Sequence, residues 1–216
     1  MSKYDLVLFD LDGTLSQSHG GVKASLIYAL NQIGKPIPPE IDDPTNYIGP
    51  PLMDTLTGMC GLSEEDAERA ADEYKEIYNS QNKYDNKCYD GINEVLQTLK
   101  ARGVKLGVAT TKYAPFAEEV LRILGIIGYF DIISGTSGDG KISTKAQVIT
   151  AAKEKLKMKE TDKVVLIGDS KFDTEGALST KIDFIGVNYG YGRQEDMKAL
   201  GASVFVDKAV DLLQIL

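Results

Sequence analysis

Residues 6–14 read Leu-Val-Leu-Phe-Asp-Leu-Asp-Gly-Thr, an apolar run that ends in two aspartates. A continuous apolar run of this kind is typical of a parallel strand that is covered on both faces. Asp10 and Asp12 leave the strand end on the same side, and Gly13 frees the backbone to turn. Two carboxylates this close repel one another unless a cation or a shared proton relieves them. The stretch therefore favours a Mg²⁺ site over the alternative, a turn in which Asp12 only caps a helix.

Further apolar runs follow the first and are separated by helical patterns. They are Val104–Ala109, Ile132–Ser134, Val164–Ile167, Phe184–Val187 and Val204–Val206. Between them, apolar residues recur every three or four positions along residues 92–99, 116–124 and 148–156. Strands that alternate with helices over short connections predict an α/β fold, a doubly wound and Rossmann-like parallel sheet.

One long segment, from Leu15 to Tyr84, interrupts this alternation and shows only helical patterns. Its apolar faces run along residues 22–33, 52–59 and 67–78, the last after a capping Ser63. We predict a catalytic core of residues 1–14 and 86–216 with an inserted α-helical cap subdomain of residues 15–85. An insertion after the first strand lies beside the carboxyl ends of the strands, where open α/β sheets bind ligands.

Polar side chains follow two other strands and open one helix. The strand at 164–167 ends in Gly168-Asp169-Ser-Lys-Phe-Asp173, the strand at 104–109 ends in Thr110-Thr111-Lys112, and Lys145 opens a helix. Each feature alone is also typical of an ordinary turn, a strand end or a solvated lysine. Together they bring acids, hydroxyls and a cation to one edge of the sheet, and packing alone does not explain that. Phosphoryl transfer needs this mixture: a nucleophile, a divalent cation and donors for phosphoryl oxygens.

In these motifs the chain resembles the haloacid dehalogenase superfamily of phosphohydrolases. Four elements match in order along the whole chain: Asp-x-Asp-Gly-Thr at 10–14, a strand ending in Thr110, a lone Lys145, and Gly-Asp-x-x-x-Asp at 168–173. The loops at 47–52 and 188–192 are similar to those of phosphoglycolate phosphatase-like members, a subgroup that includes proteins labelled 5′-nucleotidases.

The resemblance implies a role for each matched residue. Asp10 is expected to attack phosphorus and form an aspartyl-phosphate, and Asp12 to protonate the leaving alkoxide and then activate water. Mg²⁺ is expected to be held by the Asp10 carboxylate, the Asp12 backbone carbonyl and Asp169. The phosphoryl oxygens are expected to be bound by Thr110, Thr111 and Lys145, and Asp173 is expected to hold Lys145 or a metal-bound water.

The resemblance favours a Mg²⁺-dependent phosphatase for a small phosphorylated metabolite, with phosphoglycolate or a nucleoside monophosphate as the leading substrates. One alternative is a sugar-phosphate mutase, which would pass the phosphoryl group to a sugar hydroxyl. Another is a non-enzymatic signalling module that holds a long-lived phosphate on Asp10. The motifs alone do not separate the phosphatase from the mutase.

The amino-acid composition limits the classes of binding partner and the cellular location that we expect. Acidic residues exceed basic ones to give a formal net charge of −8, a bias that repels nucleic acid and anionic lipid at long range. No apolar stretch is as long as a membrane span, and Leu6–Phe9 is too short for a signal-peptide core. With Cys60 and Cys88 expected to be reduced thiols, we predict a cytoplasmic protein, monomeric or weakly homodimeric.

The sequence does not decide the roles of a few aromatic and basic residues. His19 and Lys112 are either substrate contacts or solvated side chains. The tyrosines on or just past the third helical segment are expected to pack inside the cap rather than to contact substrate; they are Tyr74, Tyr78 and Tyr84. No role is assigned to Tyr189 and Tyr191 in the glycine-rich loop.

Overall fold

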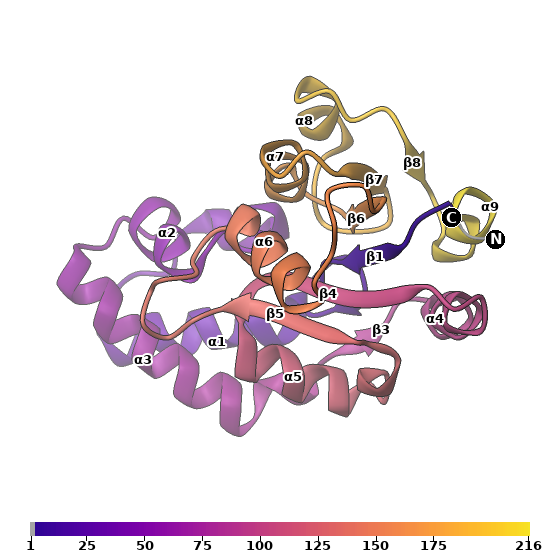
Figure 1. Ribbon diagram of the computed structural model, residues 1–216. Helices are drawn as coiled ribbons and strands as arrows, with labels where there is room; N and C mark the ends of the chain where they lie inside the picture. Colours follow the sequence, from indigo (N-terminus) through magenta and orange to yellow (C-terminus); the bar gives the residue numbers. More distant parts are fainter. Residues whose placement is uncertain (1–2) are drawn as a thin grey trace.

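The computed structural model describes residues 3–216 and contains a six-stranded parallel sheet in the order β5-β4-β1-β6-β7-β8 (Figure 1). The strands are β1 (Leu6–Phe9), β4 (Lys105–Tyr113), β5 (Ile132–Thr136), β6 (Val164–Gly168), β7 (Asp183–Val187) and β8 (Phe205–Val206). Each coincides with a predicted apolar run, and β4 continues four residues further than Ala109. The strand order reverses between β1 and β6, the position at which open α/β sheets bind ligands.

Helices cover both faces of this sheet, which explains the uninterrupted apolar sequence of β1. Val7 and Phe9 belong to the larger core on the side of α4 and α5, whereas Leu6 and Leu8 pack on the other side, beneath α6. The core helices are α4 (Ile92–Ala101), α5 (Ala114–Ile123), α6 (Lys145–Lys155), α7 (Lys171–Ser179), α8 (Gln194–Ala199) and α9 (Leu212–Ile215). The α/β fold class and the doubly wound sheet are confirmed.

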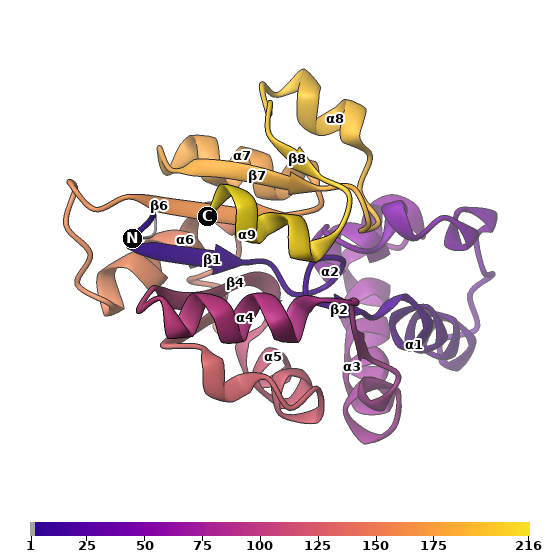
Figure 2. The same cartoon turned by 90° about the vertical axis from the view of Figure 1, so that its right-hand side faces the viewer.

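The segment between β1 and β4 forms the predicted helical insertion. Figure 2 shows its helices gathered beyond the arrowheads of the strands. They are α1 (His19–Gln32), α2 (Leu52–Asp54) and α3 (Glu64–Ser80), with α1 packed along α3. The Ser63 hydroxyl accepts a hydrogen bond from the Asp66 N–H and three acids occupy the first turn, which explains where α3 begins. We call this helical insertion the cap.

Two details of the insertion differ from the prediction. The apolar face at residues 52–59 is not one α-helix, because α2 gives way to a π-helical turn over Thr55–Met59. Strands also occur at the two connections between cap and core, where β2 (Ser16–Gln17) pairs antiparallel with β3 (Lys87–Cys88). The prediction of no strand after Leu15 was wrong for β2, because a two-residue strand whose partner lies about 70 residues away shows no local alternation. The Ser16 hydroxyl donates to Asn86 Oδ1 at 2.8 Å and holds the two connections together.

The remaining regular structure is short and lies outside the site. One-turn 3-10 helices occupy Pro39–Asp42, Pro44–Asn46, Asn82–Tyr84, Ile127–Tyr129 and Ala209–Asp211. Within residues 3–216, no helix combines the length and the apolar composition that a bilayer crossing requires.

Candidate active site

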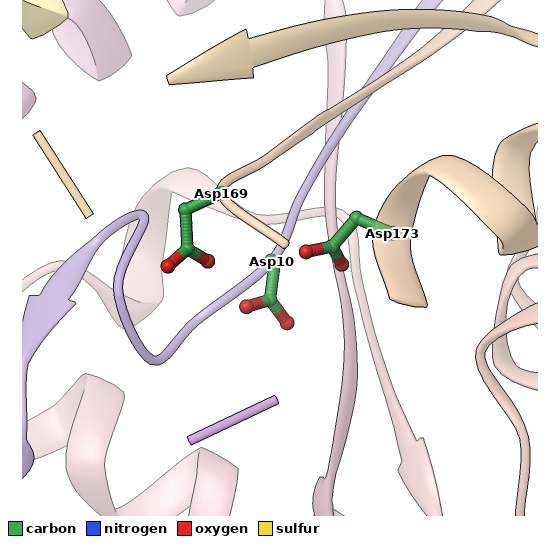
Figure 3. A group of neighbouring side chains, drawn as sticks. All are labelled: Asp10, Asp169 and Asp173. Atoms are coloured by element: carbon green, nitrogen blue, oxygen red, sulfur yellow. The ribbon is translucent and has the colours of Figure 1, made fainter. Parts of the chain in front are cut away.

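Three carboxylates from separate segments meet at the carboxyl end of the sheet. Asp10 follows β1, Asp169 follows β6, and Asp173 lies in the first turn of α7. Figure 3 shows the three side chains gathered around a common point. All three are buried, and each offers an oxygen within 4.8 Å of the others. The parallel sheet brings together acids that are about 160 residues apart in the chain.

Lys145 is the cation that contacts this carboxylate group. Its Nζ donates to Asp10 Oδ1 at 2.6 Å and to the Ala109 carbonyl oxygen at 3.0 Å, and it lies 2.7 Å from Asp173 Oδ1. Thr144 caps α6 and so fixes where Lys145 enters the site. Gly176 leaves room for the lysine stem, because a Cβ at that position would lie 2.4 Å from Lys145 Cγ. The Lys145 ammonium therefore forms ion pairs with both Asp10 and Asp173.

Burial and like charge shift the pKa values of these acids. Burial raises the pKa of Asp10 well above its usual range; Lys145 opposes this rise, whereas Asp173 and Asp169 add to it. Burial and the neighbouring Asp173 raise the pKa of Asp169 to about 7. For Lys145, burial lowers the pKa, but Asp10 and Asp173 outweigh it, so the pKa lies above the usual value and the side chain stays charged. When all three carboxyl groups are ionised, the group therefore carries more negative charge than Lys145 alone can neutralise.

The loop after β7 holds the Asp169 carboxylate in place. Asp169 Oδ2 accepts hydrogen bonds from the backbone N–H groups of Tyr191, at 2.7 Å, and Gly192, at 3.2 Å. The backbone must approach closely here, because a Cβ on Gly190 would lie 2.3 Å from Asp169 Cβ. One on Gly13, whose φ is +90°, would lie 2.2 Å from Asp169 Oδ2. Two glycine-containing loops therefore orient the carboxylate.

The donor set fits a divalent cation. Three buried carboxylates converge, hard oxygen ligands are those that Mg²⁺ prefers, and one ammonium leaves part of the charge uncompensated. Asp173 already faces Lys145 through Oδ1 and accepts hydrogen bonds from Ser170 through Oδ2. Asp10 and Asp169 are therefore the carboxylates better placed to bind an ion.

Asp12 lies outside this carboxylate group and pairs with Lys112. The Lys112 Nζ donates to Asp12 Oδ2 at 2.9 Å, and both side chains are largely buried. Among the described residues, Asp12 Oδ1 is buried without a hydrogen-bond partner. The same ammonium lies 4.8 Å from the ring centroid of Tyr78, on cap helix α3. Asp12 is thus held by one oxygen and has the other free for a further partner.

Lys112 is a site residue that the sequence left undecided. Burial lowers the pKa of Lys112, but the interactions with Asp12, Tyr78 and Tyr74 raise it by more than burial lowers it. The net pKa is therefore well above the usual value of a lysine. The available signal was strand periodicity: if the strand continues past Ala109, Lys112 faces the same side as Thr110. The strand does continue, to Tyr113, but its pairing with β5 shifts register between Ala109 and Tyr113, so regular alternation does not by itself fix the side that Lys112 faces.

The two predicted threonines differ in their contacts. Thr110 is buried, and its hydroxyl accepts a hydrogen bond from the Lys112 N–H at 3.1 Å, which leaves its proton available to a ligand. The Thr111 hydroxyl donates instead to the Gly49 carbonyl oxygen of the cap at 3.2 Å. Thr111, predicted to bind phosphate, joins core to cap here.

A cavity of about 490 Å³ lies between the core and the cap. Asp10, Asp12 and Thr110 line it from the core, and Tyr74 and Tyr78 line it from α3. The two tyrosines are buried, as predicted, but they face this cavity rather than only the cap interior. Two residues are exposed outside it: Tyr84, with 63% of its surface accessible, and His19, whose ring packs at 5.7 Å from that of Tyr191.

Similarity to known proteins agrees with this arrangement. A family model described as haloacid dehalogenase-like hydrolase matches residues 7–187. A crystal structure of a predicted phosphatase from Clostridium acetobutylicum is 40% identical, with a TM-score of 0.90, and the match covers 98% of this chain and 97% of that one.

Relatives with names include phosphatases and a kinase. A 5′-nucleotidase of Pseudomonas aeruginosa is 32% identical over 219 residues, covering 99% of this chain and 96% of that protein. The tyrosine-protein kinase PtkA of Mycobacterium tuberculosis is 39% identical over 204 residues, covering 94% of this chain and 69% of that protein.

Proposed function

The chain belongs to the haloacid dehalogenase-like hydrolase family and is a phosphatase, and on that premise we propose that it hydrolyses small phosphate monoesters with Mg²⁺ through an aspartyl-phosphate at Asp10. The observation that supports this most is the position of Asp10. Its carboxylate lies buried at the cavity, with Lys145 at 2.6 Å on one oxygen and Asp12 and Thr110 lining the same space.

In the first step, a carboxylate oxygen of Asp10 forms a bond to phosphorus while the bond from phosphorus to the alcohol oxygen breaks. Asp12 gives the departing oxygen its proton. In the second step, Asp12 takes a proton from water, the water oxygen bonds to phosphorus, and the bond to Asp10 breaks to release inorganic phosphate. The free Oδ1 of Asp12 is the atom we assign to this proton transfer.

Phosphoryl oxygens would be held by Thr110, through its hydroxyl, and by the Lys145 ammonium. Donors aimed at developing charge lower the barrier most in a water-poor cavity. Asp173 would keep Lys145 in position, as their 2.7 Å contact suggests. When bound, Mg²⁺ would supply further positive charge beside the phosphoryl group, and we assign it to Asp10, Asp169 and the backbone carbonyl of Asp12.

We propose that residues 15–85 act as a cap that moves against a core of residues 1–14 and 86–216. The paired connections β2 and β3 lie at the boundary and would be the hinges. A cap that closes over the cavity excludes bulk water and brings its own side chains to the substrate.

Release of inorganic phosphate from a panel of monoesters with Mg²⁺ tests the proposal. Asp10→Asn is expected to reduce kcat by about 10⁴ or more, because the nucleophile is lost. Asp196→Asn, an exposed acid of α8, is the matched control and should leave kcat unchanged. Full activity in Asp10→Asn would contradict the mechanism. A single phosphate per chain would favour the phospho-acceptor, and a requirement for an acceptor sugar would favour the mutase.

A further inference from the structure

Aromatic side chains form a continuous row along one side of the cavity. We call this row, made of Tyr74, Tyr78, Phe116 and Tyr113, the aromatic wall. Tyr74 and Tyr78 are stacked at 5.6 Å between ring centroids, Phe116 lies 5.9 Å from Tyr78, and Tyr113 lies 5.4 Å from Phe116. All four line the same cavity as Asp10. The wall begins on cap helix α3 and ends on the core.

The cavity offers little positive charge to an anionic leaving group. Among the described residues that line it, the basic ones are Lys75 and Lys112. Lys112 is paired with Asp12, and Lys75 is half exposed and paired with Asp72 on the same helix. The carboxylate of glycolate or a second phosphate would therefore compete with Asp12 for the Lys112 ammonium, and the neutral hydroxyl groups of the lining would offset only part of the cost of its desolvation.

The rest of the lining is mostly apolar, although hydroxyl side chains such as Thr136 and Ser137 also contribute, and the space is larger than a two-carbon acid needs. Val22, Leu26, Ile48 and Leu52 contribute from the cap, opposite the catalytic edge of the sheet. About 490 Å³ falls within the usual range for sites that enclose a drug-sized ligand. An apolar ring gains most from such a surface, because it loses no hydrogen bonds on entering and can pack against neighbouring rings.

From these observations we propose that the substrate is a phosphate monoester of an apolar aromatic alcohol, with its ring against the aromatic wall and its phosphate at Asp10. This inference rests on the proposed function for the chemistry, but the binding part does not require turnover. The wall belongs to both cap and core, so one ring contacts both parts and favours the closed arrangement. The sequence made phosphoglycolate and a nucleoside monophosphate the leading substrates. The charge of the cavity disfavours phosphoglycolate.

Benzyl phosphate and 2-phosphoglycolate make a matched substrate pair, because both release an alkyl alcohol. We expect kcat/KM with Mg²⁺ to be at least about 100-fold higher for benzyl phosphate, mainly through KM. Phe116→Ala should reduce this ratio about tenfold, since Phe116 is a half-buried member of the wall and carries no group that the proposed mechanism uses. Tyr84→Ala, which removes an exposed ring outside the cavity, should leave the ratio unchanged.

Binding separates this inference from the proposed function. Benzylphosphonate and phosphonoacetate do not turn over, and their Kd values can be measured by calorimetry with Mg²⁺ even if no ester is hydrolysed. Tighter binding of benzylphosphonate, weakened in Phe116→Ala, supports the aromatic site whether or not phosphate is released. Equal binding, or tighter binding of phosphonoacetate, overturns it even in an active phosphatase. A Phe116→Leu variant repeats the comparison if the alanine variant does not fold.

Discussion

Replacing Lys145 with methionine should destabilise the folded protein strongly at neutral pH in the absence of metal. The lysine Nζ lies 2.6 Å from Asp10 and 2.7 Å from Asp173, and all three side chains are at most 8% exposed. Removing one partner of a buried ion pair costs about 3–5 kcal/mol, because the remaining charge stays buried. Here one ammonium serves two carboxylates, so we expect about 4 kcal/mol or more. In a chain of this size, that corresponds to a Tm lower by about 8–16 °C.

The pH dependence of this loss has a defined sign. Burial, together with Asp173 and Asp169, already raises the pKa of Asp10 despite Lys145, and removing the lysine raises it further. A carboxyl whose folded pKa is raised favours the folded state while it keeps its proton. The variant should therefore regain stability relative to the wild type as the pH falls from 8 to 5.

Thermal unfolding in EDTA, followed by circular dichroism at pH 8 and pH 5, measures both effects. Lys141→Met is the matched control, because Lys141 is 83% exposed and pairs with the exposed Asp139, so its loss should leave Tm unchanged. Equal Tm values for Lys145→Met and the wild type at pH 8 would refute the assignment of a buried, charged Lys145. A deficit that grows at pH 5 would refute the electrostatic explanation.

Three further outcomes are expected. Gly190→Ala should weaken Mg²⁺ binding by about 10–100-fold in calorimetry, because the added Cβ displaces Asp169, whereas Gly128→Ala, with open space around it, should bind normally. Since the pKa of Asp169 is raised to about 7, its charging disfavours the folded metal-free protein as the pH rises through that value, and Mg²⁺ must displace its proton below it. Mg²⁺ should therefore raise Tm more at pH 8 than at pH 5.5, and an equal shift would contradict this. Lys112→Met should lower kcat about 10–100-fold, because Asp12 loses its charged partner, without changing the Kd for Mg²⁺; an unchanged kcat would show that the pair is not needed.

The fold followed from local sequence patterns where those patterns are strong. Each apolar run of the parallel sheet, such as Leu6–Phe9, is covered on both faces and shows this in its own composition. The paired strands β2 and β3 could not be predicted in this way, since two residues have no period and their pairing depends on how the cap is inserted. The π-helical turn at Thr55–Met59 likewise replaces a helix that the apolar spacing alone favoured.

The sequence alone predicted some residues of the candidate site better than others. Asp10 and Asp169 stand out because each directly follows or closely follows an apolar run, whereas Lys145 was singled out only together with the other motifs, because it opens a helix after a polar loop. Their catalytic roles remain predictions. The part played by Tyr191 had no such signal, because its backbone N–H rather than its side chain contacts Asp169. Thr111 carries the expected hydroxyl, but a cap carbonyl oxygen accepts its hydrogen bond.

By itself, the order of residues determined which segments become buried strands and which polar groups reach their carboxyl ends, because both follow from neighbours along the chain. Only the tertiary structure decided which of these groups touch. Lys145 reaches Asp10 across 135 positions, and cap helix α3 packs over Lys112 and keeps it buried on Asp12. Charge pairing and burial depend on distances through space, and these are set by contacts between segments that are remote in sequence.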